Sequence, residues 1–156
     1  MKEISKDMLY TILSGVGVFV VSQLIMEFIL KPVIFYKELK GRIASNIVYA
    51  AQYYENPLSR ENFWDLSISE KYKEAYQEVS NELRKLASEL AGFQEAHRVL
   101  FPCKDRKKAV ELAILNLIGL SNGLICPEKN MEKTIELNEK RKQEILKALD
   151  IQMGDF

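Results

Sequence analysis

The sequence has few cysteines and no excess of charge, and both absences restrict the classes of protein it can belong to. Two cysteines, Cys103 and Cys126, are too few for a disulfide framework and are expected as reduced thiols in a cytosolic domain. The 22 basic and 22 acidic residues balance, so no net field steers the protein to nucleic acid. A disulfide-stabilised secreted domain and a strongly basic nucleic-acid binder are therefore disfavoured.

Histidine is scarce as well, and recognisable catalytic motifs are missing. His97 is the only histidine and lies in an apolar helical pattern, where a packed, hydrogen-bonded side chain is expected. A zinc site with Cys103 and Cys126 would have ligand spacings that match no known pattern. The sequence contains no P-loop, glycine-rich phosphate cradle or carboxylate-rich metal motif. We therefore predict no enzyme, no cofactor and no metal.

One long apolar stretch stands near the start of the chain. Residues 8–30 contain a single ionisable side chain, Glu27, and about 20 apolar residues suffice to span a bilayer. A cleaved signal peptide would have a shorter apolar core and a small-residue cleavage site, and a buried soluble helix would not be apolar on every face. We therefore predict an N-terminal tail and transmembrane helix over residues 1–32.

The flanks of this stretch predict its orientation. Lys2 and Lys6 on the N-terminal side are offset by Glu3 and Asp7, whereas four cations follow the stretch: Lys31, Lys37, Lys40 and Arg42. Cytoplasmic flanks carry the excess of Lys and Arg. The pattern predicts a single-pass protein of the bacterial inner membrane, with the N-terminus outside and the following domain in the cytoplasm, close to membrane lipid.

Two polar residues interrupt the apolar stretch. Gln23 and Glu27, at i and i+4, are expected on one helix face, and Gly15 and Ser22 add small side chains that permit close approach. Polar groups inside a membrane usually face a protein interior or water, which other copies of the chain would supply. This pattern predicts homo-oligomerisation, with a ring of these side chains lining a pore as a narrower version. The alternative is that Glu27 pairs with Lys31 one turn away.

The remainder of the chain shows helical periodicity and no strand alternation. It predicts an all-α protein in which the transmembrane helix precedes a cytoplasmic antiparallel bundle of three to four helices over residues 33–149, with a flexible tail at 150–156. The expected helices cover about 33–54, 69–101, 105–122 and 128–149. The third is expected to end at Gly123, and the fourth has a weak apolar pattern that predicts a peripheral position.

Two further patterns have a functional and a plain interpretation. Four cations, Lys104, Arg106, Lys107 and Lys108, stand at a helix start, where they oppose the helix dipole but could bind an anion or a partner. A solvated face is the alternative. Three small-residue pairs, Gly41/Ser45, Ser88/Gly92 and Gly119/Gly123, predict close helix packing within the bundle or between subunits.

The segments KGRIASNIVYAAQYYENP, SNELRKLASELAG and NLIGLSNGL resemble a family of short, uncharacterised bacterial membrane proteins over residues 33–124. The resemblance implies the same architecture and no assigned activity. In layout alone the chain is similar to the small membrane accessory proteins of type VI CRISPR systems, which combine one membrane helix with a cytoplasmic helical domain and assemble into pores.

The leading functional hypothesis is a non-enzymatic, self-associating sensor–effector of antiviral defence or stress response, which responds to a cytosolic protein or nucleotide trigger and forms or gates a pore. The second is a membrane-tethered adaptor that binds a cytosolic partner through its bundle. The third is a regulator that binds a nucleotide or lipid at residues 104–108.

Overall fold

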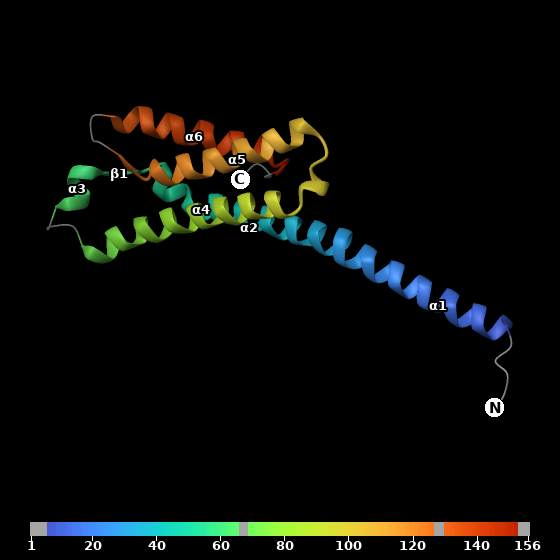
Figure 1. The fold of residues 1–156 in the computed structure, drawn as a ribbon. Coiled ribbons are helices and arrows are strands. Elements are labelled where there is room, and N and C mark those ends of the chain that lie inside the picture. Colours follow the sequence, from blue (N-terminus) through green and yellow to red (C-terminus); the bar gives the residue numbers. More distant parts are fainter. Residues whose placement is uncertain (1–5, 66–68, 127–129, 153–156) are drawn as a thin grey trace. The chain divides into compact units, whose positions relative to one another are not determined.

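The structure is a computed structural model that describes residues 6–65, 69–126 and 130–152. These residues are almost wholly helical, which confirms the predicted all-α class (Figure 1). The chain divides into two compact units, residues 1–37 and 38–156. Each unit is described by itself below.

The first unit contains the apolar helix. Helix α1 (Lys6–Ile25) continues into a π-helical turn, η1 (Met26–Leu30), and then into α2 (Lys31–Tyr54). None of the residues of α1 is buried. By length and composition, the helix that begins at Lys6 is the one helix among the described residues that could cross a membrane.

Pro32 gives a physical reason for the π-helical turn. Proline has no N–H, and its ring clashes with the carbonyl four residues earlier, which here belongs to Phe28. In η1 the Lys31 N–H instead donates to the Met26 carbonyl, five residues earlier, which is the bond of a π-helix. The helix therefore continues past Pro32, but the regular α-helical spacing is interrupted over Met26–Leu30.

The second unit is a helical bundle formed by the rest of α2, α4 (Glu70–Ala96), α5 (Lys104–Asn122) and α6 (Met131–Ala148). The connections contain α3 (Arg60–Trp64), the 3₁₀ turn η2 (Arg98–Leu100) and two very short strands, β1 (Leu58–Ser59) and β2 (Ile125–Cys126), which pair in parallel. Fully buried side chains come from all four long helices and include Leu39, Ile43, Ile47, Leu83, Leu90, Ala113, Leu117, Leu120 and Ile145.

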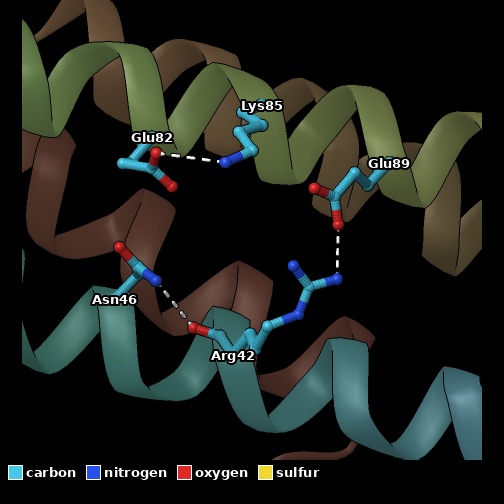
Figure 2. Close-up of polar contacts among 5 residues, drawn as sticks. All are labelled: Arg42, Asn46, Glu82, Lys85 and Glu89. Carbon is cyan, nitrogen blue, oxygen red and sulfur yellow. Dashed lines mark hydrogen bonds and ion pairs between the residues drawn. The ribbon is translucent and has the colours of Figure 1, made fainter.

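Contacts between facing helices show that neighbours run in opposite directions. Arg42, near the start of the part of α2 that belongs to the second unit, forms an ion pair with Glu89 in the second half of α4 (Figure 2). At the other end, the hydroxyl of Tyr76 in the first half of α4 donates to the Asn56 carbonyl, just after α2, at 2.6 Å. We call the end that holds residues 38–42 the Arg42 end of the bundle.

The expected position of the last helix is wrong. Asn138, Ile145 and Leu149 of α6 and its C-cap are buried, so α6 is a full member of the bundle. The Asn138 amide nitrogen donates to the Tyr54 carbonyl at 3.2 Å and to the Gly123 carbonyl at 3.1 Å. The fully buried Asn138 interrupts the apolar pattern of the sequence. Its hydrogen bonds join α6 to the ends of α2 and α5.

The small-residue pairs divide into two groups. A Cβ atom added at Gly123 would lie 2.0 Å from the Asn138 side-chain oxygen, and one at Gly119 would lie 2.6 Å from Nε of Arg141. This pair serves close packing inside the bundle, as one of the two alternatives predicted. Gly41 and Gly92 would meet nothing within 4 Å, so their pairs lie on open surfaces.

Several boundaries differ from the predicted ones. Helix α4 ends at Ala96 rather than near Pro102, because the chain turns through η2 before that proline. Trp64, the last residue of α3, is 75% exposed. Asp150 adopts a positive φ of 52°, and the Ile151 N–H donates to the Leu146 carbonyl, so the start of the predicted tail completes the helix cap. Residues 153–156 of that tail lie outside the described residues.

Candidate functional site

The first candidate site is the set of small and polar residues in the apolar helix. A Cβ atom at Gly15 would meet nothing within 4 Å, and the Ser22 hydroxyl donates to the Val18 carbonyl at 2.8 Å. Both residues are exposed, so this part of α1 offers a surface on which a second helix could approach closely. The serine hydroxyl is already satisfied within its own helix.

Gln23 and Glu27 differ in their partners. The Glu27 carboxylate forms an ion pair with Lys31 one turn later, and both side chains are largely exposed. The Gln23 amide is exposed and makes no hydrogen bond within the described part of the chain. The structure therefore brings Glu27 to Lys31, the alternative weighed from the sequence, and leaves the glutamine amide available.

The π-helical turn changes the expected alignment of these two residues. Gln23 lies in α1, whereas Glu27 is the second residue of η1. A π-helix places more residues in each turn than an α-helix, so the i, i+4 rule no longer fixes one shared stripe across this turn. Pro32 is the signal in the sequence from which this change could have been inferred.

The second candidate site is the basic start of α5. Lys104, Arg106, Lys107 and Lys108 are all exposed within the first five residues of the helix. Lys107 lies 3.8 Å from Glu111, and the other three cations form no ion pair among the described residues. The structure therefore gathers the four predicted residues into one exposed basic cluster.

The turn that precedes this cluster is fixed from inside the bundle. Phe101 is buried, and its ring packs edge-on against Phe93 at 6.1 Å between centroids. The buried Gln94 donates from Nε2 to the Lys107 carbonyl at 2.9 Å. His97 stacks on Phe93 at 4.4 Å, and its Nδ1 lies 3.2 Å from the Phe93 carbonyl. The histidine is packed and hydrogen-bonded, which is the interpretation that the sequence favours.

Two residues of the same turn escaped the sequence analysis. Val99 is 90% exposed, and Arg98 adds a fifth cation next to it. Arg98 forms an ion pair with Glu95 and holds the pKa of that carboxyl below its usual value through the hydrogen bond between them. Residues 98–108 contain five basic side chains and one acidic side chain. This composition could have identified Arg98 as part of the basic cluster.

Metal ligation has no support in the described residues. Cys103 is exposed and Cys126 is buried, and both are free thiols. No group of three or more His, Cys, Asp or Glu side chains within residues 6–65, 69–126 and 130–152 is arranged to hold a metal ion. Comparison of the chain with protein-family models, curated proteins and solved structures finds no match.

Proposed function

We propose that the protein is a non-enzymatic, self-associating sensor–effector of the bacterial inner membrane. The apolar helix crosses the membrane once with its N-terminus outside, and residues 33–149 form an antiparallel bundle in the cytoplasm. Copies gather through the face that holds Gly15, Ser22 and Gln23, and a rearrangement of the bundles changes how the membrane helices pack or opens a pore. Such a device would act in antiviral defence or stress response.

The observation that carries this proposal is the exposed Gln23 amide, which has no hydrogen-bond partner among the described residues and lies in a helix that buries none of its residues. In lipid, a glutamine side chain gains hydrogen bonds only from other protein groups or from water, and such bonds between helices contribute about 0.6–2 kcal/mol. A second copy of the same helix supplies the matching amide. Glu27 is neutralised by Lys31 within one chain, so it is the secondary member of the face.

The test compares two double variants of the full-length protein in detergent. In Gln23→Leu/Glu27→Leu both polar side chains are removed, and we expect the oligomer measured by light scattering to dissociate to smaller species. Thr11→Val/Ser14→Ala is the matched control, because those hydroxyls donate to backbone carbonyls of their own helix at 2.9 Å. We expect the control to keep the wild-type mass.

A second measurement separates self-association from pore activity. Cells that express the wild-type protein should lose membrane potential, recorded with a potential-sensitive dye, when the trigger is present. Cells with the double leucine variant should keep it. A monomeric wild-type protein in lipid would contradict the proposal as a whole, whereas an oligomer without any depolarisation would contradict only the pore.

The second candidate function is a membrane-tethered adaptor. One observation favours it: Leu112, Leu115 and Ile118 are exposed at three-residue spacing on α5, which gives an apolar stripe suited to a partner helix. An adaptor needs the apolar helix only for attachment. Replacement of residues 8–30 by an unrelated membrane helix should therefore preserve the function of an adaptor and abolish that of the sensor–effector.

A further inference from the structure

We propose that the α4–α5 turn, residues 98–108, docks on the anionic headgroup layer of the membrane that the apolar helix enters. This inference rests on the membrane anchoring proposed above and assigns a ligand to the basic cluster. The turn combines an apolar tip with surrounding cations. That is the combination with which peripheral segments bind anionic lipid, through buried apolar area and attraction to the headgroups.

The exposed side chains of the turn suit contact with lipid headgroups better than contact with water alone. Val99 is 90% exposed, while the neighbouring Phe101 is buried against Phe93 and fixes the turn. The packed Phe101 therefore holds this part of the turn in place, with Val99 at the surface. Lys104, Arg106 and Lys108 form no ion pair among the described residues, so their charges are free to attract lipid phosphates.

The turn lies at one particular end of the second unit. Glu89 pairs with Arg42, and α4 continues from Glu89 towards His97 for about 12 Å beyond that pair. Helix α5 then starts at the same end, because Gln94 bonds the Lys107 carbonyl. Residues 98–108 thus lie at the Arg42 end of the bundle, as the yellow segment of the second unit shows in Figure 1.

Chain connectivity limits how far this end can be from the bilayer. Glu38, the first residue of the second unit, lies seven residue steps after Lys31, which directly follows the apolar stretch. Seven residues span at most about 25 Å even when fully extended. The first residue of the second unit is therefore tethered to the headgroup layer, and anionic lipid is the partner that this tether supplies at high local concentration.

The experiment uses the exposed Cys103 as a native labelling position within the turn, since Cys126 is buried. A polarity-sensitive fluorophore on Cys103 of the full-length protein reports the environment in nanodiscs of phosphatidylcholine alone or mixed with phosphatidylglycerol. We expect a blue shift only in the anionic discs, and a loss of that shift at high salt, which screens exposed charges. Cys103→Ser should take up no label.

Variants of exposed residues connect the shift to the turn. Lys104→Glu/Lys108→Glu and Val99→Asp should each abolish most of the blue shift. Lys133→Glu/Lys140→Glu is the matched control, because these exposed cations of α6 lie on either side of Asn138, which bonds the Tyr54 carbonyl at the opposite end of the bundle. The control variant should keep the shift.

The outcomes separate this inference from the anchor on which it rests. Protein that fails to elute with the discs would contradict membrane anchoring itself. Protein that is incorporated, but whose label reports the same polarity in neutral and anionic discs, overturns only the docking of the turn. A blue shift that appears in detergent and grows with protein concentration also overturns it, because a second copy then covers the turn.

Discussion

At the scale of single residues, Gly123 shows that a correct prediction can have a different cause. The sequence indicates a helix C-cap, and Gly123 is the C-cap of α5. Its φ is −79°, which any residue can adopt, so conformational freedom does not require glycine here. The requirement comes from Asn138, whose side-chain oxygen occupies the space of a Cβ atom.

Two glycine-to-alanine variants test this explanation. Gly123→Ala should lower the free energy of unfolding by about 1–3 kcal/mol, because the added methyl overlaps Asn138 and forces it to move. Gly92→Ala adds the same methyl to an open helix surface and should raise that free energy by about 0.4–1 kcal/mol. Urea unfolding of the full-length protein in detergent measures both. Similar effects of the two changes would contradict the close approach.

At the scale of helices, α4 and α5 were the most predictable from the sequence and α6 the least. Sustained apolar periodicity located both helices. The one difference is that α4 ends earlier than predicted, at Ala96. The inward side of α6 and its C-cap runs through the half-buried Ile135 and Lys142 and the buried Asn138, Ile145 and Leu149. Two polar residues in the middle of that series concealed it, because apolar periodicity does not count an asparagine as a core residue.

The hydrogen bonds of Asn138 should contribute much of the free energy that holds α6 in the bundle. Asn138→Ala removes the donor of two buried carbonyls, those of Tyr54 and Gly123, and should lower the free energy of unfolding by about 2–4 kcal/mol. Gln143→Ala, an exposed change in the same helix, should cost less than about 0.5 kcal/mol. Equal urea midpoints for the two variants would show that the buried hydrogen bonds contribute little.

Short elements could not be predicted from periodicity at all. Strands β1 and β2 have two residues each, too few for an alternating pattern, and they pair because α2 and α5 end beside each other: the Leu58 N–H donates to the Leu124 carbonyl at 2.8 Å. The π-helical turn likewise has no apolar signature, and only Pro32 hints at it. Of the candidate sites, the basic cluster was predictable as a run of cations, whereas the exposure of Val99 depends on how Phe101 packs.

At the scale of the whole molecule, buried tyrosines make the stability of the bundle sensitive to alkali. Burial raises the pKa of Tyr54 to about 12 and also raises that of Tyr76 well above the ordinary value of 10.0. The folded state therefore favours the neutral phenols. Their contribution is fully present below about pH 10 and is lost as the pH rises towards the folded pKa values.

The measurement is the urea midpoint of the full-length protein at about pH 8, 10 and 11. These values lie below, at and above the pKa of a tyrosine in the unfolded chain. We expect the midpoint to fall between the last two values, and Tyr54→Phe should make that fall smaller because one raised pKa is removed. Tyr49→Phe, a change at a residue that is 59% exposed, serves as the control. A fall of the same size in Tyr54→Phe would assign the alkaline loss to other groups.

The fastening of α2 has a consequence for how the domain matures. Lys40 donates to the Leu149 carbonyl, 109 residues later in the chain. The Tyr54 carbonyl accepts a hydrogen bond from Asn138, which is 84 residues later. Helix α2 finds its first partner in α4, through the Arg42–Glu89 ion pair, but its bonds with Leu149 and Asn138 form only after α6 has been synthesised. Newly made chains therefore cannot close the contact between α2 and α6 until residue 149 has been synthesised, which delays any assembly that needs the closed bundle.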